Sequence, residues 1–503
     1  MTALPAPSTV SGLVRRARSL VNTPAGALFL VVIGVYAYFY QAGGWNQNSR
    51  FDLVRAVVEQ GSFSIDRYEH NTGDDSLRDG HYYCDKAPGA SVLCIPPYWL
   101  TYQLSGAPDS VSPTWLAWAA WLAIVLAIGV PSAIALTFLA RLALRLGLSP
   151  PAAYGLALLA GLGTMSLPYA TLLYGNQLAG SLMLIAFCLL VEIRQGRAAT
   201  VRRMLLVGGL LGYAAATEYP AVLIGGPIAI YGLFVAGWRR ARFAIVGGML
   251  PMTLLFAYHW ALFGSPLAFP YDYSVWPTPH TGWFMGIGMP RGTALQNILF
   301  GEYRGLFNTT PWLLAALPGA VMLFRRHRVE AAICIWAVLA FLWLNASIPP
   351  WDGGWAAGPR YLVPMLPFLS LLAGGVLSGT AEQRGVSRRW LRGVVISLFV
   401  ALGLFSAANM FAATAVKPEI PTHEKDPYSQ LIWPKFRAGD LAISTQSIDM
   451  IDNPPNAPRQ AWNLGMKAGL QGHASLIPLY VWVVATLAWL AVVLKRASSV
   501  SVR

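Results

Sequence analysis

The chain has 503 residues, of which 55% are hydrophobic and 12% are charged, and its formal net charge is +14. This composition is typical of an integral membrane protein and excludes an ordinary soluble domain. The positive charge is divided among short arginine clusters and forms no basic stripe on a soluble domain, so we predict no nucleic-acid partner.

Long apolar runs recur from the start of the chain to its end, and each approaches the roughly 20 residues that a helix needs to cross a bilayer. The first run, GALFLVVIGVYAYFY, is long and has no small-residue cleavage site, so we expect no cleavable signal peptide. Thr23 and Pro24 precede it, as is typical of an N-cap and the first position of a helix.

Clusters of basic residues occur in every second connection between the apolar runs. They are Arg15/Arg16/Arg18, Arg141/Arg145, Arg194/Arg197/Arg202/Arg203, Arg239/Arg240/Arg242, Arg325/Arg326/Arg328, Arg384/Arg388/Arg389/Arg392 and Lys495/Arg496. Such clusters favour the cytoplasmic side of a membrane. The pattern therefore predicts about twelve spanning helices in the cytoplasmic (inner) membrane, with both termini in the cytoplasm.

The longer connections lack these clusters and are expected on the outer face. They cover approximately residues 43–113, 264–310, 345–361 and 417–474. Of the 22 acidic residues, eight lie between Asp52 and Asp85 in the first of these loops. In the spans we find essentially one acid, Glu218, and an acid inside a membrane is a functional candidate.

The chain has no evident internal repeat, and we predict one membrane domain rather than a series of modules. Its parts are a transmembrane domain over residues 1–415 that includes the first outer loop at 43–113, an outer loop or small cap at 416–474, and a last spanning helix with a cytoplasmic tail at 475–503.

The stretch SRFDLVRAVVEQG in the first outer loop predicts a short amphipathic helix in the membrane interface. Its apolar face consists of Leu53, Val54, Val57 and Val58. Asp52, Arg55 and Glu59 share the opposite face. This polar face either contacts water, with an Arg55–Glu59 pair contributing roughly a few tenths of a kcal/mol, or closes over a site. Spacing alone favours the face in water.

The segment HYYCDKAPG, residues 81–89, immediately precedes the next apolar run, and its Pro88-Gly89 turn fixes the position of the chain. Lys86 either extends its amine to the membrane surface or holds a lipid phosphate as a point charge. Cys84 and Cys94 either pair in an oxidising compartment or remain free thiols, and the sequence favours neither. His81 has no partners at metal-ligand spacing, so we predict no metal.

Several stretches together resemble one known family. They are NSRFDL after the first span, GHYYCDKAPG, YHWALFGSPLAFPY, GEYRGLFNTTPWLLAALPG and WDGGWAAGPRYLVPMLPFL. The chain resembles the polyprenyl-phosphate-sugar-dependent glycosyltransferases of the C-type membrane fold, in particular relatives of the protein O-mannosyltransferases and of the lipid A aminoarabinose transferase. The resemblance extends to about Gly375 and implies an all-α polytopic fold whose first extracytoplasmic loop bears short interfacial helices.

The resemblance also implies a reaction. A hexose or pentose would pass with inversion from a polyprenyl-phosphate donor to a lipid, cell-envelope glycan or protein acceptor on the periplasmic or extracellular side. Asp52 occupies the position of the family's essential acid and would be the general base. Lys86, and then Arg304 and Arg360, would stabilise the phosphate as it leaves. Some relatives use a divalent cation, and Asp74, Asp75 and Asp85 leave that possibility open, although we predict no cofactor.

Further side chains are candidates for lining the substrate site. They are Glu59, Tyr82, Tyr83, Asp85, Trp351 and Trp355. Tyrosine and tryptophan are also common in membrane interface belts, so a structural role suits them equally well. Cys84 departs from the family, which usually has a small residue, often serine, at that position.

Two alternatives to a glycosyltransferase remain. A lipid or sugar transporter or flippase would suit twelve spans with Gly- and Pro-broken helices, but the chain lacks an inverted repeat and has very few ionisable residues in its spans. An inactive scaffold would not need both Asp52 and Lys86.

Overall fold

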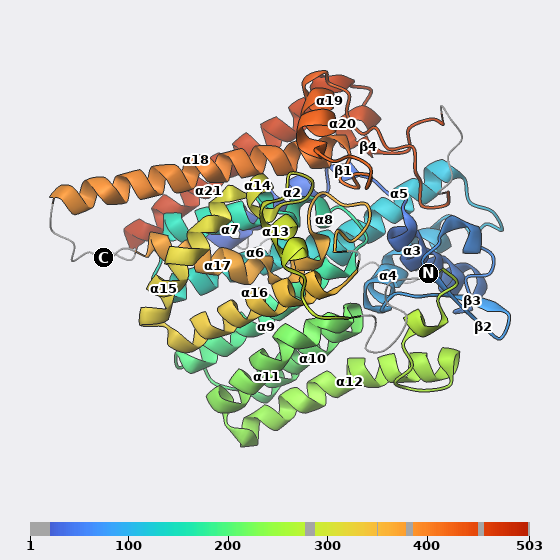
Figure 1. Ribbon diagram of the computed structural model, residues 1–503, viewed down its shortest axis with the longest axis horizontal. Helices are drawn as coiled ribbons and strands as arrows, with labels where there is room; N and C mark the ends of the chain where they lie inside the picture. Colours follow the sequence, from blue (N-terminus) through green and yellow to red (C-terminus); the bar gives the residue numbers. More distant parts are fainter. Residues whose placement is uncertain (1–20, 277–286, 350, 379–385, 451–456, 501–503) are drawn as a thin grey trace, which may run out of the picture.

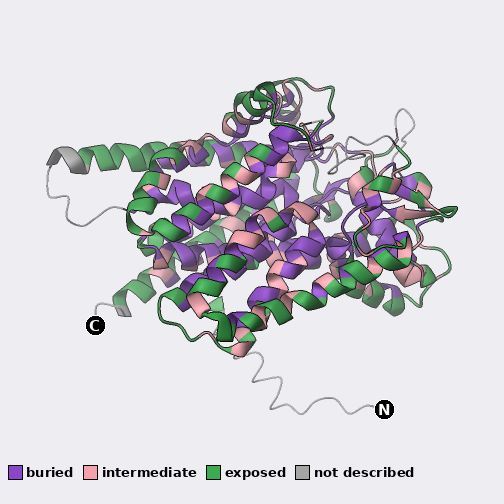
Figure 2. Ribbon diagram, turned by 60° about the horizontal axis from the view of Figure 1, so that its bottom comes forward, coloured by how far each residue is buried: buried purple, intermediate pink, exposed green. Residues whose placement is uncertain are grey.

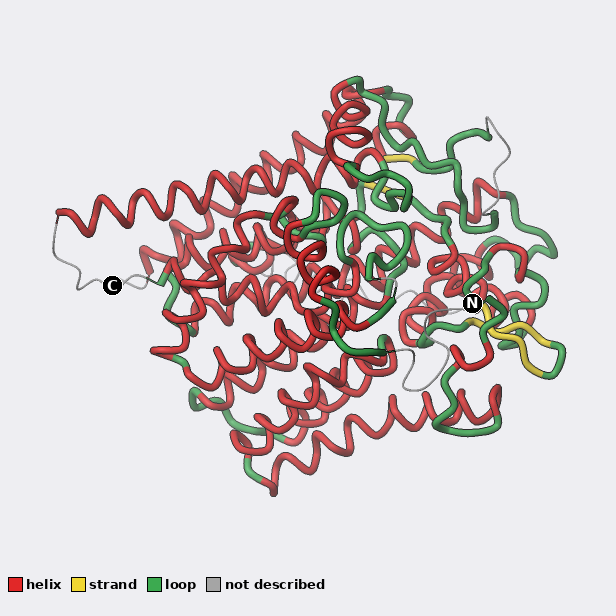
Figure 3. The backbone as a smooth tube through the Cα atoms, in the orientation of Figure 1, coloured by secondary structure: helices red, strands yellow, loops and turns green. Residues whose placement is uncertain are grey.

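The computed structural model describes residues 21–276, 287–349, 351–378, 386–450 and 457–500. Regular structure in these residues is almost entirely helical, and the strands are short segments near one end of the molecule (Figure 3). The prediction of an all-α polytopic membrane protein is confirmed. Arg15, Arg16, Arg18 and Arg384 of the basic clusters lie outside the described residues.

Within the described residues, twelve helical elements form the bundle if α5 and α6 are counted as one (Figure 1). They are α2 (Pro24–Tyr36), α5 (Pro113–Ile124) continuing through a π-helical turn into α6 (Val130–Arg145), α7 (Pro150–Leu162), α9 (Gly175–Arg194), α10 (Val201–Thr217), α11 (Val222–Ala236), α12 (Trp238–Phe263), α15 (Ala316–Arg326), α16 (Arg328–Ser347), α17 (Leu366–Gly374), α18 (Val386–Val416) and α21 (Ile477–Val500). Eight spans among them are long and apolar enough to cross a membrane, and α2 and α7 are shorter apolar helices. With α10 and α15, which pack among them, the total agrees with the predicted number of about twelve.

Most of the short elements gather at one end of the bundle, which we call the loop end, whereas residues 292–309 lie over the middle of the bundle in Figure 1. The short elements are α3 (Trp45–Arg55), α4 (Gly89–Leu104), α8 (Ser166–Tyr169), α13 (Gly292–Phe300), α14 (Leu306–Thr309), α19 (Trp433–Arg437), α20 (Leu464–Lys467), β1 (Phe39–Tyr40), β2 (Asp75–Arg78), β3 (His81–Cys84) and β4 (Trp462–Asn463). The first turn of α18 and the end of α21 lie at the opposite end (Figure 1), which also carries the described arginine clusters and is called the arginine end. This separation agrees with the alternation of basic clusters along the sequence.

At the arginine end, two buried acids correct the expectation that Glu218 is essentially the one acid within the spans. Glu192 in α9 forms ion pairs with Arg141, with Arg145 at 3.5 Å and with Arg197 at 3.1 Å. Glu330 in α16 lies 2.7 Å from the Arg194 guanidinium. These acids are tolerated because arginines neutralise them.

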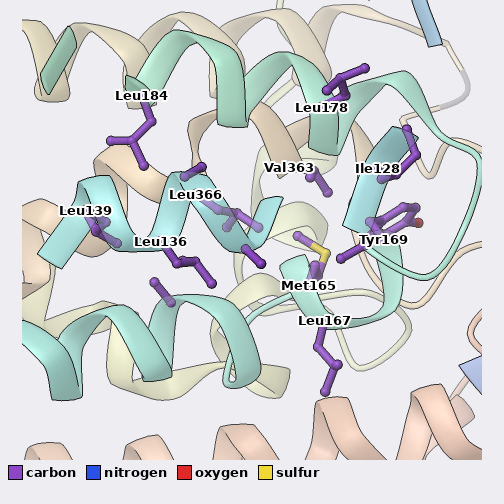
Figure 4. Packing of buried hydrophobic residues seen from close by; sticks show 14 of the residues in the cluster. Ile128, Leu136, Leu139, Met165, Leu167, Tyr169, Leu178, Leu184, Val363 and Leu366 are labelled. Atoms are coloured by element: carbon purple, nitrogen blue, oxygen red, sulfur yellow. The ribbon is translucent and has the colours of Figure 1, made fainter. Parts of the chain in front are cut away.

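The centre of the bundle is α9, whose most apolar 18-residue stretch is 94% buried, whereas the corresponding stretch of α12 is only 17% buried and lies at the periphery. Apolar side chains from α6, α8, α9 and the start of α17 interlock in this core (Figure 4). Most of the residues in the first half of α18 are exposed, and Figure 2 draws them in green. Exposed apolar helices on the outside of such a bundle are expected where lipid covers them.

The residues after Lys417 fold back onto the first outer loop. β4 pairs with β1 in antiparallel register, with Phe39 opposite Asn463 and Tyr40 opposite Trp462. Asn48 of α3 donates a hydrogen bond to the Ser447 carbonyl at 3.1 Å. We call residues 417–471 the tail segment; it packs on the loop that carries most of the predicted site.

Helices α10 and α12 approach each other through glycine. A Cβ added to Gly208 would lie 1.7 Å from the Ala244 carbonyl oxygen, and one added to Gly247 would lie 2.1 Å from the Leu205 carbonyl oxygen. Small residues at such an interface let two helix backbones pack closely inside a membrane.

Gly208→Ala should therefore destabilise the protein by about 1–3 kcal/mol, because the methyl group forces the two helices apart. The measurement is the thermal unfolding midpoint in detergent. Gly226→Ala in α11 is the matched control, since no atom lies within 4 Å of its added Cβ. Equal midpoints for the two variants would contradict the close packing.

Candidate functional site

A cavity of about 440 Å³ opens at the loop end, between the first outer loop, the α10–α11 connection, α16 and the start of the Arg360–Leu377 span. Its polar wall carries three cations and two carboxylates: Arg50, Lys86, Arg360, Asp74 and Glu218. The remaining wall is formed mainly by aromatic and aliphatic side chains. The cavity wall therefore combines charged groups with apolar surface.

Lys86 reaches the cavity from the end of a hairpin. Strands β2 and β3 pair in antiparallel register, which sets Asp75 opposite Cys84 and brings Asp74 beside the residues that follow β3. The Lys86 Nζ lies 3.0 Å from both the Asp74 and the Asp85 carboxylates. Burial lowers the pKa of Lys86, but the two carboxylates raise it by more, so the amine remains charged.

Arg50 and Glu218 form a buried ion pair across the cavity wall. The Arg50 Nη2 donates to the Glu218 Oε1 at 2.7 Å, and its Nη1 donates to the Ala87 carbonyl at 2.9 Å. A Cβ on Gly175 would lie 2.3 Å from the Glu218 Oε1, so α9 must begin with glycine for the carboxylate to fit. Burial raises the pKa of Glu218, which lies between two spanning helices, and the Arg50 cation opposes that rise.

Arg360 differs from the other two cations. Its Nη1 donates to the Tyr174 hydroxyl at 3.2 Å, and its guanidinium lies over the rings of Tyr174 and Tyr361 at 5.2 and 5.4 Å from their centroids. Within the described residues, no carboxylate forms an ion pair with it. Arg360 therefore presents an unneutralised positive charge to the cavity.

A second, apolar groove of about 680 Å³ adjoins the cavity. Leu223 of α11 and Trp343 of α16 line both spaces. Leu295, Leu299 and Leu339 are among its other lining residues. A molecule with a charged head and a long apolar chain would match the two spaces taken together.

Asp52, the predicted general base, lies away from this cavity. The side chain is fully buried, does not line the cavity and accepts a hydrogen bond from the Asn71 amide at 3.3 Å. Burial raises the pKa of Asp52 well above its usual value, which favours the neutral acid. The helix is also not amphipathic in its environment, because residues 47–55 are all buried.

Two further predicted residues also lie away from the cavity. Arg304 is 1% exposed, and its guanidinium donates to the Asp352 and Ile420 carbonyls at 3.0 and 3.2 Å, so it ties loops together rather than facing the cavity. Glu59 accepts hydrogen bonds from Arg55, Tyr68 and Tyr98 at 2.9, 2.9 and 2.6 Å. The predicted Arg55–Glu59 pair exists, but it is buried rather than in water.

The aromatic candidates are near the site without lining it. Tyr82 and Tyr83 lie on β3, and the Tyr83 ring contacts Phe263. Trp351 contacts Tyr303, and the Trp355 ring lies 5.0 Å from the Lys417 amine. Asp85 does not line the cavity either, but its carboxylate forms the ion pair with Lys86 described above.

The cavity contains residues that the sequence did not single out. Arg50 lies in the NSRFDL stretch, and no sequence pattern marks Arg50, Tyr271 or Tyr361 as a site residue. Glu218, expected as an acid in a span, lies instead in the connection between α10 and α11, where it lines the cavity. Within the described residues, no three His, Cys, Asp or Glu side chains are arranged to hold a metal ion.

No family model and no curated protein sequence matches the chain. Among solved structures, it is similar to ArnT from Cupriavidus metallidurans in the apo state, with 18% identity and a TM-score of 0.46 over 97% of this chain and 77% of that one. It is also similar to the archaeal oligosaccharyltransferase AglB from Archaeoglobus fulgidus, solved with an inhibitory peptide and a dolichol-phosphate, with 10% identity and a TM-score of 0.45 over 76% of this chain and 55% of that one.

The four cysteines are all free and buried, so the open question about Cys84 and Cys94 is answered in favour of separate thiols. Cys84 accepts a hydrogen bond from the Ser49 hydroxyl at 3.1 Å, and Cys94 donates to the Ala123 carbonyl at 3.8 Å.

A maleimide added without reductant should therefore label no cysteine in the folded protein and all four after denaturation in sodium dodecyl sulfate. Mass spectrometry counts the labels. Two labels after denaturation would mean that a disulfide is present.

Proposed function

We propose that this protein is an inverting glycosyltransferase that moves a hexose or pentose from a polyprenyl-phosphate donor to a hydroxyl of a lipid, cell-envelope glycan or protein. One observation carries the proposal: Arg360 and Lys86 line a cavity that shares Leu223 and Trp343 with an adjoining apolar groove. A polyprenyl phosphate has the same two parts, an anionic head and a long apolar chain. The sequence resemblance supports the same donor.

The cations would act most strongly as the bond between sugar and phosphate breaks. The phosphate oxygen that leaves gains negative charge, and fixed cations at that oxygen stabilise the transition state more than the ground state. Arg360 suits this role because its charge is not already balanced, and its planar guanidinium can hold two phosphate oxygens at once. Lys86 would add a second point charge while Asp74 and Asp85 keep it protonated.

Glu218 is our candidate for the general base. Its Oε1 is held by Arg50, and burial raises the pKa of Glu218, which makes it a better proton acceptor near neutral pH than an ordinary glutamate. It would take the proton from the acceptor hydroxyl as that oxygen bonds to the anomeric carbon and the phosphate departs. Asp74 is the other cavity carboxylate, but it is engaged by Lys86.

We also propose that the loop end faces the periplasm or the exterior, because the arginine clusters that favour the cytoplasmic side lie at the opposite end. The donor's chain would enter from the membrane through the groove between α11, α13 and α16.

Purified protein in lipid vesicles should convert a radiolabelled polyprenyl-phosphate sugar to polyprenyl phosphate when a cell-envelope extract supplies the acceptor. Arg360→Ala should lower kcat/KM by roughly 10²–10³-fold, because a donor to the developing charge is lost. Arg67→Ala, an exposed arginine of the first loop, is the matched control and should be unaffected. Movement of the intact donor across sealed vesicles without cleavage would instead favour a transporter.

Glu218→Gln should lower kcat by roughly 10²–10⁴-fold at saturating donor, because the amide cannot accept the proton. Asp52→Asn should retain most of the activity, since Asp52 does not reach the cavity. The two variants are compared in the same transfer assay. A reversal, with Asp52→Asn inactive and Glu218→Gln active, would return the base to the position that the sequence resemblance gave.

A further inference from the structure

The tail segment contributes one buried carboxylate next to the cavity, at Glu419. The Tyr174 hydroxyl donates to the Glu419 Oε1 at 2.6 Å, and the same hydroxyl accepts from the Arg360 guanidinium at 3.2 Å. Arg360, Tyr174 and Glu419 therefore form a chain of hydrogen bonds, which we call the relay. Glu419 lies 59 residues after Arg360 in the sequence.

Glu419 is itself held rigidly. Its Oε2 accepts from the Gln47 amide of α3 at 2.8 Å, and the Gln47 Oε1 accepts from the Leu173 backbone N–H at 3.0 Å. Gly44 has a φ of +98°, and a Cβ there would lie 2.9 Å from the Glu419 Oε1. The backbone therefore closes over the carboxylate and leaves it little room to move.

The relay also has a chemical consequence. A direct carboxylate–arginine pair would neutralise Arg360 and compete with an anionic ligand. Here a tyrosine stands between them, so the hydroxyl orients the guanidinium and the acid orients the hydroxyl. Arg360 is held by Tyr174 and still lines the cavity.

The geometry points to Glu419 as a positioning residue for the lipid-phosphate site: through Tyr174 it fixes Arg360, and the tail segment thereby completes the site. This inference rests on the proposed function. It assigns a role to the part of the chain to which the family resemblance gives none.

Glu419→Gln and Tyr174→Phe should each lower kcat/KM for the donor by about tenfold or more, since residues that orient a binding group typically contribute this much. The main effect should be a higher KM, because Arg360 contacts the phosphate in the ground state too. The double variant should be no worse than the poorer single variant, since both changes break the same relay. Glu424→Gln, in the same segment, is the matched control and should behave as wild type.

A thermal stability measurement separates positioning from a structural role. Burial raises the pKa of Glu419 to about 7, against hydrogen bonds from Tyr174 and Gln47 and the charges of Arg360 and Lys417. Because its pKa is higher in the folded than in the unfolded protein, ionisation of Glu419 costs stability as the pH rises from about 4.5 to about 7. The thermal unfolding midpoint of Glu419→Gln should therefore fall less between pH 5 and pH 8 than the midpoint of the wild type. The donor affinity of the variant should nevertheless be lower.

Binding of a fluorescent polyprenyl phosphate without sugar, measured beside transfer, distinguishes the two possible failures. If wild type binds and transfers while Glu419→Gln and Tyr174→Phe do the same with unchanged KM, the positioning role is overturned and the proposed function stands. If both variants lose activity only in proportion to lost folded protein, the role is structural and the inference is again overturned. If wild type neither binds the lipid phosphate nor transfers sugar, the proposed function is overturned, and so is the inference that rests on it.

Discussion

The ion pair between Arg50 and Glu218 is the contact on which the arrangement of the site depends. It joins α3 in the first outer loop to the connection between α10 and α11. The same guanidinium holds the Ala87 carbonyl, which is the backbone next to Lys86. One side chain therefore sets the position of a cavity acid and of a cavity lysine. Removing one partner of such a buried pair leaves the other charge uncompensated, at a cost of about 3–5 kcal/mol.

The bundle could be predicted from the sequence because its signals are local. Apolar run lengths and alternating basic clusters depend on neighbouring residues, and they gave the helical class and the approximate number of spans. Lys86 could also be predicted from its neighbours, because the rigid Pro88-Gly89 turn follows it in the sequence. Glu192 and Glu330 were missed because each is an acid whose neutralising arginines lie mostly on other helices.

The site within α3 could not be predicted in this way. Arg50 and Asp52 are two positions apart, and two residues on a helix rotate the side chain by roughly 200°, so only one of them can face the cavity. The amphipathic pattern suggested that the polar face would contact water or the site. In the structure, Asn71 and the tail segment cover that face instead. No local signal reveals this cover, because Gln47 and Glu419 are 372 residues apart.

The distribution of charge explains why the site requires so many distant segments. Arg50 and Lys86 each form an ion pair with a carboxylate within 3.0 Å, whereas Arg360 has no direct carboxylate partner among the described residues and is linked to Glu419 through the Tyr174 hydroxyl. A cation held in this way within a partly apolar cavity is costly unless an anion arrives. The fold offsets that cost with the packing of α3, the start of α9 and the tail segment around the relay. An anionic lipid head would then restore the missing balance, so that binding and stability are linked through the same arginine.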